Sequence, residues 1–176
     1  LISRIENSWG RTIHKADPGT RRALSPQTTF IMTELLRQVV RDGTGWRAKK
    51  LDRPVAGKTG TTNNQKEAWF AGYTPNLLTT VYCGFDNPRP MGKYETGSRA
   101  ASPIWVSYMR KVVSEYPRRD FQKPEGIAMA DIAARSGKLS GPDCGKSYLL
   151  PFRKGNIPDK VDATGGKDMR TLQEIF

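Results

Sequence analysis

Residues 55–72, VAGKTGTTNNQKEAWFAG, are the part of the chain best suited to chemistry, because one lysine and three threonines stand within five positions. The GKT tripeptide at 57–59 matches the end of a phosphate-binding loop, in which backbone amides and a lysine hold phosphate oxygens. The KTG tripeptide at 58–60 matches instead one wall of a serine acyl-transfer cleft. The two interpretations share residues and predict unrelated chemistry.

A phosphate-binding loop requires the pattern G-x-x-x-x-G-K-[ST] before a helix. Counted back from Gly57, the first glycine should stand at position 52, but Asp52 places a negative charge there. Pro54 also removes a backbone amide from the phosphate cradle. The residues after Thr59 read GTTNN, which favours a strand and a turn over the start of a helix. The sequence therefore argues against nucleotide binding.

The KTG tripeptide on a strand suits acyl transfer for physical reasons. Lys58 would add positive potential beside a nucleophile and a substrate carboxylate, and Thr59 would offer that carboxylate a neutral donor. Gly60 would let a ligand or another backbone come close to the strand, and an amide just past it could stabilise a tetrahedral oxyanion. An exposed strand edge can also accept an extended peptide. Taken alone, the tripeptide is equally compatible with a solvated strand.

Three strand patterns surround and follow the tripeptide. They cover residues 54–62, 67–73 and 78–85, and the third is rich in β-branched and aromatic residues. Short turns that contain Asn or Pro join them. Short connections favour antiparallel neighbours, so the pattern predicts an antiparallel meander with the tripeptide on its first strand.

Two helices are expected on either side of this meander in the sequence. The first has Ser25 as N-cap, Pro26 as first helical residue and Gly43 as C-cap, followed by a Gly-Thr-Gly loop. The second begins with Ser102 as N-cap and presents an apolar stripe of Trp105, Tyr108, Met109, Val112 and Val113. We expect that stripe to lie in the core.

The remaining segments complete a mixed fold. Residues 2–5 and 12–14 flank an Asn-Ser-Trp-Gly turn and predict an opening hairpin, and residues 126–139 suggest another around positions 136–137. The expected fold class is α+β, with an antiparallel β-sheet of about five strands, the meander plus the opening hairpin, and helices packed on it. Residues 1–150 would form the folded portion, and residues 151–176 a polar linker or tail.

The composition excludes some classes of protein and leaves others open. The 176 residues have a formal net charge of +12, which favours anionic partners or a solvated basic surface without a dedicated partner. Cys83 and Cys144 stand far apart without neighbouring His or Cys, which excludes a zinc site of ordinary spacing. A disulfide between them is possible, although the apolar run around Cys83 favours a small buried side chain. No apolar run reaches the length of a membrane span.

Five motifs follow one another along the chain: SPQTTFIMTELLRQVVRDGTG, VAGKTGTTNNQKEAWFAGYTP, VYCGFDNP, ASPIWVSYM and PFRKGNIP. In this order they resemble the class A penicillin-binding proteins, bifunctional peptidoglycan synthases with a C-terminal transpeptidase domain. The resemblance covers about residues 4–158, and it implies the C-terminal portion of a transpeptidase domain of the penicillin-binding and serine β-lactamase-like fold. The family's order of helix, GTG loop, KTG strand, further strands and packing helix matches the elements expected above.

The resemblance implies catalytic and substrate-binding roles for Lys58, Thr59, Gly60 and Thr61. Lys58 would assist proton transfer and electrostatics during acylation. Thr59 and Thr61, with Gly60 between them, would hold the terminal carboxylate of a D-alanyl-D-alanine stem peptide or of a β-lactam that mimics it. The Thr61 amide would supply one oxyanion donor. The reaction passes through a serine ester and implies no metal and no organic cofactor.

Four neighbouring or unusual residues receive no catalytic role. Thr62 is expected to support the end of the strand, and Glu67 stands where the family usually has Asp. Trp69 is expected to pack on its strand rather than approach the cleft, and His14, the only histidine, to lie on the surface of the opening hairpin.

The chain contains neither Ser-x-x-Lys nor Ser-x-Asn, the motifs that precede KTG in the family. We therefore expect the nucleophile and its partner motif to lie upstream of Leu1 in a longer synthase, and this segment alone to be inactive. The resemblance implies that the parent binds peptidoglycan stem peptides and β-lactams. It also implies that a missing N-terminal segment anchors the parent at the outer face of the bacterial cytoplasmic membrane.

A basic, non-catalytic module that binds nucleic acid or a cell-wall partner is the alternative. The net charge of +12 would suit it, but the basic residues are scattered and no aromatic–basic alternation of the RNA-binding type occurs. Such a module would not explain the ordered motifs, and the resemblance implies no nucleic-acid partner.

Overall fold

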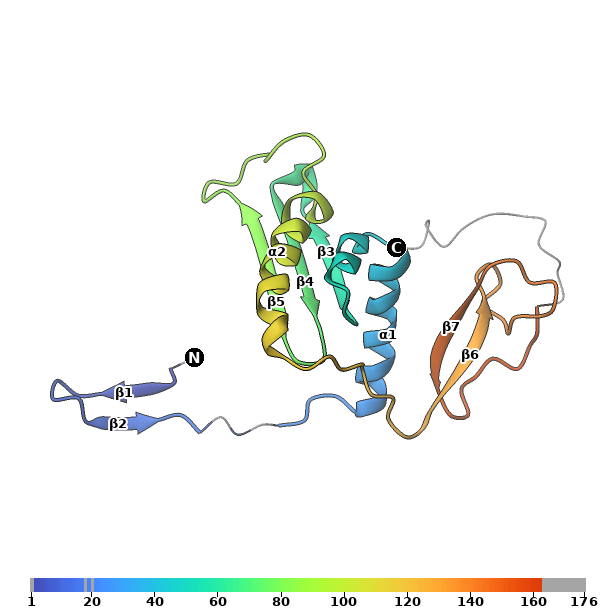
Figure 1. Ribbon diagram of the computed structural model, residues 1–176, viewed down its shortest axis with the longest axis horizontal. Coiled ribbons are helices and arrows are strands. Elements are labelled where there is room, and N and C mark those ends of the chain that lie inside the picture. The colour runs from blue at the N-terminus through green and yellow to red at the C-terminus, as the bar shows by residue number, and fades with distance from the viewer. Residues whose placement is uncertain (1, 18, 20, 163–176) are drawn as a thin grey trace.

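A computed structural model describes residues 2–17, 19 and 21–162, which form an α+β fold of small antiparallel sheets and packed helices (Figure 1). The elements follow in the order β1 (Arg4–Glu6), β2 (Thr12–Lys15), α1 (Pro26–Asp42), β3 (Ala56–Thr61), β4 (Glu67–Tyr73), β5 (Leu78–Gly84), α2 (Ser102–Val112), β6 (Ile127–Ala133) and β7 (Ser147–Arg153). Short 3₁₀ or π turns lie at Trp46–Leu51, Asn63–Gln65, Gly97–Ala101 and Val113–Glu115. The expected fold class is confirmed.

The central meander is the predicted one, with the strand order β3-β4-β5 and antiparallel pairing throughout. Figure 1 shows α2 across one face of this sheet and α1 beside β3. The fully buried Trp105 of α2 meets Phe70 of β4 edge to face, with ring centroids 5.1 Å apart. The core around this pair contains Val40, Ala48, Leu51, Val55, Ala101, Val106, Met109 and Val113. The stripe expected on the second helix is thus largely core, although Tyr108 is exposed.

The first helix begins and ends where its cap residues predict. Ser25 Oγ accepts a hydrogen bond from the Thr28 amide at 3.2 Å, and Pro26 is the first helical residue. Gly43 follows the last helical residue with φ −113°, so it does not form the left-handed cap that glycine often provides. Its small size matters instead, because a Cβ there would lie 3.0 Å from the Val39 carbonyl oxygen.

The expected single sheet of about five strands is divided among separate sheets. The opening hairpin forms, but among the described residues β1 and β2 pair only with each other, and Figure 1 shows them apart from the meander. His14 is exposed on β2, as expected. Adjacency in the sequence therefore indicated the hairpin correctly but not its place in the fold.

The C-terminal part forms a second hairpin in which β6 pairs with β7 over seven residues each. The turn expected around positions 136–137 is present, and an isolated β-bridge between Ile132 and Leu139 closes it. The main partner of β6, however, is β7. The boundary expected after residue 150 falls inside β7, and a further bridge joins Leu139 to Val161. Pro151 lies within β7. Because proline normally interrupts a β-strand, the sequence did not predict a strand at this position. Residues 163–176 of the expected tail lie outside the described residues.

The second helix begins differently from the expectation. Ser102 is its first residue rather than its N-cap, it is fully buried, and its hydroxyl donates to the Gly97 carbonyl at 3.1 Å. A π-helical turn, Gly97–Ala101, precedes it. The serine therefore ties this turn to the helix, whereas a cap would accept a bond from a helix amide.

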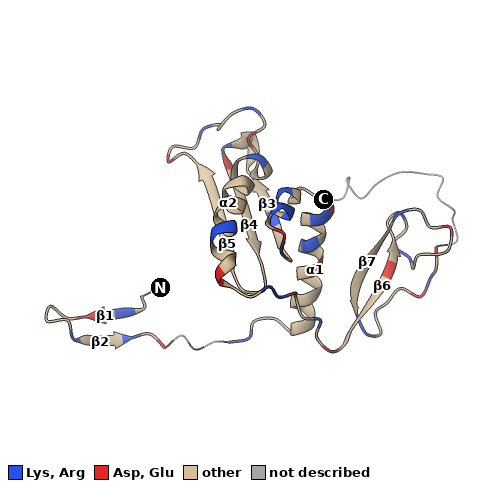
Figure 2. Ribbon diagram, viewed as in Figure 1, with Lys and Arg blue, Asp and Glu red and all other residues tan. Residues whose placement is uncertain are grey.

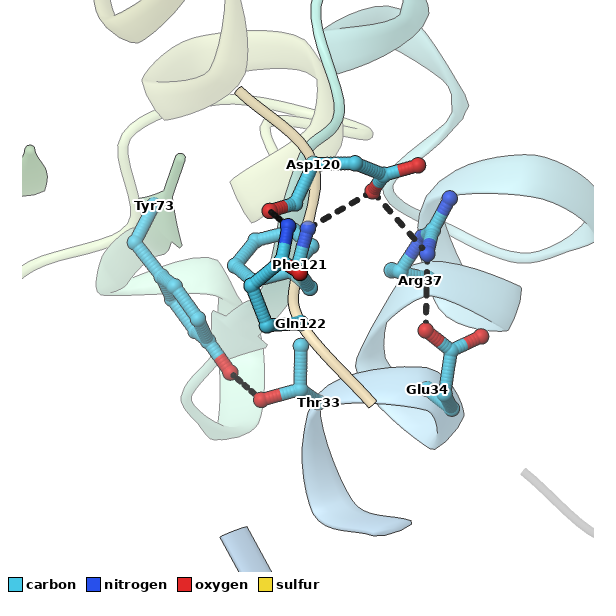
Figure 3. Close-up of polar contacts among 7 residues, drawn as sticks. All are labelled: Thr33, Glu34, Arg37, Tyr73, Asp120, Phe121 and Gln122. Atoms are coloured by element: carbon cyan, nitrogen blue, oxygen red, sulfur yellow. Dashed lines mark hydrogen bonds and ion pairs between the residues drawn. The ribbon is translucent and has the colours of Figure 1, made fainter. Parts of the chain in front are cut away.

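A cluster of polar and aromatic contacts ties α1 to the end of β4 (Figure 3). Thr33 and Tyr73 share a hydrogen bond of 2.9 Å between their hydroxyls, and Tyr73 meets Phe121 edge to face at 5.6 Å. Arg37 forms ion pairs with Glu34 at 2.7 Å and Asp120 at 3.4 Å. These contacts fix α1 against the sheet, which in turn places the loop after α1 near β3.

Candidate active-site strand

The KTG tripeptide lies on β3, which is an edge strand of the meander. Pairing with β4 sets the direction of its side chains, because directly paired residues of an antiparallel ladder share a face. Lys58 pairs with Ala71, and Gly60 pairs with Trp69, on the face away from the Trp105 core. Thr59 and Thr61 pair with buried residues of β4 and lie on the other face. The strand thus presents an ammonium and two hydroxyls on opposite sides of one edge.

Lys58 is exposed although it lies in the middle of a strand. Its Nζ donates to the carbonyl oxygen of the adjacent Thr59 at 3.0 Å. Within the described part of the chain it takes part in no ion pair, so its positive charge is not neutralised by a carboxylate. The charge is available to an anionic ligand at this edge.

Thr59 is half-buried and has a neighbour that sequence reasoning did not select. Its Oγ1 lies 2.7 Å from Oγ1 of Thr44, the central residue of the Gly-Thr-Gly loop after α1. The pair brings together two hydroxyls 15 residues apart in the sequence. The only sequence signal for Thr44 is its place between two glycines at the end of a helix.

Thr61 is exposed, and its Oγ1 accepts a hydrogen bond of 3.0 Å from the amide of Gly97. The backbone of Gly97 also lies against β3, since a Cβ on Gly97 would be 2.6 Å from the Gly60 carbonyl oxygen. This close approach depends on the missing side chain of Gly97, whereas a Cβ on Gly60 would instead lie 3.2 Å from the Trp69 Cβ. Sequence reasoning missed Gly97, which stands in a Pro/Gly-rich loop without a recognisable motif.

Beyond the tripeptide, the neighbouring residues have structural contacts. Thr62 accepts from the Glu67 amide at 2.9 Å and so supports the end of the strand, as expected. Trp69 is 41% exposed and packs on Tyr82, with ring centroids 4.6 Å apart. Desolvation, and then the nearby Glu67 carboxylate, raise the pKa of Tyr82. Burial raises the pKa of the Cys83 thiol, which packs against the core, and both Cys83 and Cys144 are free.

This arrangement suits the recognition of an extended, anionic ligand by a strand edge. Lys58 supplies charge, Thr59 and Thr61 supply hydroxyls, and an edge strand can pair with a peptide backbone. A phosphate-binding loop is contradicted, because Lys58 and Thr59 lie inside a strand instead of at the start of a helix. No cluster of three or more His, Cys, Asp or Glu side chains within the described residues could hold a metal ion.

Comparison with known proteins decides the family. The sequence model of the family "Penicillin binding protein transpeptidase domain" matches residues 1–109, which is more than half of the chain. The chain belongs to the penicillin-binding protein transpeptidase family. The match includes α1, the Gly-Thr-Gly loop, the meander with its KTG strand, and most of α2.

Individual relatives agree with this family. The chain is 37% identical over 158 residues to "Penicillin-binding protein 1A" of Aquifex aeolicus, covering 90% of this chain and 22% of that protein. It is 37% identical over 142 residues to the protein of the same name from Pseudomonas aeruginosa, covering 80% and 17%. The crystal structure of Penicillin-Binding Protein 1A from Haemophilus influenzae is similar over 92% of this chain and 30% of that chain, with 28% identity and a TM-score of 0.74.

The chain spans about a fifth of the length of the curated relatives it matches. Neither α1 nor α2 has the length and apolar character needed to cross a membrane, and the same holds for every other helix in residues 2–162 that the structure describes.

Proposed function

We propose that this segment provides the carboxylate-binding wall of a peptidoglycan D,D-transpeptidase that cross-links stem peptides by serine acyl transfer. The observation that supports this most is the position of KTG on an edge strand, with Lys58 and Thr61 exposed, in a chain that belongs to the transpeptidase family. The ligand class follows from the chemistry of the edge, since a strand, an ammonium and hydroxyls together suit a peptide with a free carboxylate.

Each residue of the strand has a proposed task in this reaction. Lys58 lowers the energy of the developing negative charge and assists proton transfer around the nucleophile. Thr59 and Thr61 donate to the terminal carboxylate of D-alanyl-D-alanine or of a β-lactam, with Gly60 leaving room between them. The Thr61 amide contributes to the oxyanion hole. Binding the carboxylate places the scissile carbonyl beside the nucleophile, which is how such contacts contribute to rate.

The nucleophile itself must come from residues outside this segment. None of its serines is followed three residues later by lysine, and the nearest matches have arginine, as in Ser8-Trp9-Gly10-Arg11. The guanidinium of arginine stays protonated and cannot act as a base. We propose that a Ser-x-x-Lys and a Ser-x-Asn motif of the complete synthase face β3, and that the synthase acts at the outer face of the bacterial cytoplasmic membrane.

The 176-residue segment, expressed alone, should not be labelled by a fluorescent penicillin, whereas the complete synthase should be. The reason is that acylation needs a serine activated by a lysine, which the segment lacks. Gel fluorescence followed by peptide mapping measures both outcomes, with denatured synthase as the control for non-specific labelling. Labelling of a serine within these 176 residues would contradict the assignment, and an unlabelled native synthase would contradict the proposed function.

Thr61→Val in the complete synthase should slow penicillin acylation by about 10- to 100-fold, because it removes one donor to the carboxylate. Thr61→Ser keeps the hydroxyl, both towards the ligand and towards the Gly97 amide, and should stay within about 3-fold of wild type. Stopped-flow acylation rates measure the difference. Equal rates for wild type and Thr61→Val would remove this hydroxyl from the site.

A basic module for nucleic acid is the second candidate, and the distribution of charge does not favour it. Figure 2 shows Lys and Arg on β1, which lies apart from the meander, as well as on α1 and α2, which pack against it. Retention on DNA with a steep salt dependence would support that candidate.

A further inference from the structure

We propose that Thr44 is a positioning residue that orients the hydroxyl of Thr59 towards the substrate carboxylate, an inference that rests on the function proposed above. The observation behind it is the 2.7 Å contact between Thr44 Oγ1 and Thr59 Oγ1. This is a short hydroxyl–hydroxyl hydrogen bond, and it joins the loop after α1 to the KTG strand.

The backbone places Thr44 at the apex of a tight loop. The amides of Gly43 and Gly45 both donate to the Val39 carbonyl, at 3.1 Å and 3.0 Å. A Cβ on Gly43 would lie 3.0 Å from that oxygen, and one on Gly45 would lie 3.2 Å from it. Only small residues fit at positions 43 and 45. Thr44 is therefore the one residue of this three-residue loop with a side chain, and that side chain contacts β3.

The position of this loop does not depend on the Thr44 hydroxyl. Helix α1 is held against the sheet 11 residues earlier, where Thr33 bonds to Tyr73, as Figure 3 shows. Tyr73 pairs with Ala56 at the start of β3, and Thr59 lies nearer its end. Two hydroxyl contacts thus join α1 and its loop to the meander at separate points, and loss of the Thr44 contact should leave the helix in place.

The chemistry of hydroxyl groups gives the pair its direction when a ligand is present. A threonine hydroxyl donates one hydrogen bond and accepts up to two. If the Thr59 hydroxyl donates its proton to a carboxylate, it cannot also donate to Thr44. In the Thr44–Thr59 hydrogen bond, Thr44 must then be the donor and Thr59 the acceptor. The hydrogen bonds then run from Thr44 to Thr59 to the carboxylate. Bonds in such a chain polarise one another, and the last one is strengthened by the negative charge.

Without the Thr44 hydroxyl, Thr59 would rotate among its staggered rotamers and accept from water instead. Its hydroxyl would still reach the carboxylate, but part of the binding free energy would be used to orient it. The effect should therefore appear in reversible capture of the ligand more than in the chemical step.

In the complete synthase, Thr44→Val should raise the dissociation constant for the reversible benzylpenicillin complex by about 3- to 10-fold, the range expected for one net hydrogen bond. The acylation rate constant within that complex should change by less than about 2-fold. Rapid-quench measurements over a range of benzylpenicillin concentrations separate the two constants. Thr29→Val is the matched control, because it also removes a threonine hydroxyl bonded at 3.0 Å, here to the Ser25 carbonyl in the first turn of α1.

Three further measurements separate positioning from a structural role. Thr44→Ser keeps the hydroxyl and should restore the wild-type constant, whereas a packing role for the methyl group would predict the reverse. Benzylpenicillin methyl ester lacks the carboxylate, so wild type and Thr44→Val should bind it equally. In a Thr59→Val background, Thr44→Val should have no additional effect, because its acceptor has gone.

The results can overturn this inference without touching the proposed function. If Thr59→Val weakens capture but Thr44→Val does not, Thr44 has no positioning role and the carboxylate-binding wall stands. If Thr44→Val still weakens capture after Thr59→Val, Thr44 contacts the ligand directly and the positioning role is wrong. If Lys58 and Thr59 variants both acylate at the wild-type rate, the proposed function itself is wrong.

Discussion

Lys58→Ala in the complete synthase should slow acylation by benzylpenicillin about 100- to 1000-fold, the loss typical when one preorganised electrostatic group is removed. The ammonium lies exposed on an edge strand, bonded only to the adjacent Thr59 carbonyl, and within the described residues no carboxylate forms an ion pair with it. Its charge is therefore available to an anionic ligand and to negative charge that develops during acylation, once the ligand displaces the water that screens it. We expect the loss to exceed that of Thr61→Val, because a charge is removed and not only a dipole.

Two control variants make this result specific. Lys111→Ala removes the same charge from an exposed position on α2 and should leave acylation unchanged, which excludes an effect of net charge alone. Lys58→Arg keeps the positive charge but cannot exchange a proton near neutral pH. Recovery by Lys58→Arg would assign the residue an electrostatic role, and continued loss would add a role in proton transfer. Acylation by Lys58→Ala at the wild-type rate would remove Lys58 from the site.

Much of the local structure could be predicted from the sequence because it depends on local patterns. The three strands of the meander fell within two residues of their expected bounds at each end, and Ser25 and Pro26 marked the start of α1 correctly. Short turns between strands leave antiparallel pairing as the simple solution. The motif residues could also be placed on one edge strand, because the strand that contains them is the first of the meander.

Two of the features that were not predicted depend on contacts between distant segments, and a third depends on a hydrogen bond within one turn. The residues of the opening hairpin do not themselves indicate that it forms a sheet separate from the meander. Strand β7, which pairs with β6, was not predicted because it contains Pro151. Ser102 has the local pattern of an N-cap, but a buried bond to the Gly97 carbonyl uses its hydroxyl. N-cap preference is a weak prior where another side-chain hydrogen bond competes for the same hydroxyl.

The same limit applies to the candidate site. Lys58, Thr59, Gly60 and Thr61 were recognisable as a short motif, whereas their supporting residues belong to loops 15 and 36 residues away from the threonines that they contact. Thr44 contacts Thr59, and Gly97 contacts Thr61, so each of these two threonine hydroxyls has a partner from a different connecting segment. The geometry of a site depends on such partners as much as on the residues that touch the ligand.

Gly97→Val should lower the free energy of unfolding of the folded unit that contains β3 by about 3 kcal/mol, at the upper end of what overpacking usually costs. Gly97 is buried, and a Cβ there would meet the Trp69 carbonyl oxygen, the Gly60 carbonyl oxygen at 2.6 Å and the Gly60 nitrogen at 3.1 Å. All three are backbone atoms of paired strands, which cannot move aside as the end of a flexible side chain can. Either the turn must leave β3 or the pairing of β3 with β4 must distort.

Both responses should also change the positions of the residues proposed to bind the ligand. If the turn leaves β3, Thr61 loses the amide that bonds to its hydroxyl, and if the strands distort, Lys58 and Thr59 move. We therefore expect acylation by Gly97→Val to fall together with its thermal stability, as followed by differential scanning fluorimetry and stopped-flow labelling at a temperature where the variant is still folded. Gly84→Val is the matched control, because the atoms nearest to a Cβ there belong to the outer part of the Tyr82 ring, a side chain that is 46% exposed, and not to the backbone of paired strands. A Gly97→Val variant as stable and as reactive as Gly84→Val would show that the turn can be repacked freely and that β3 does not depend on it.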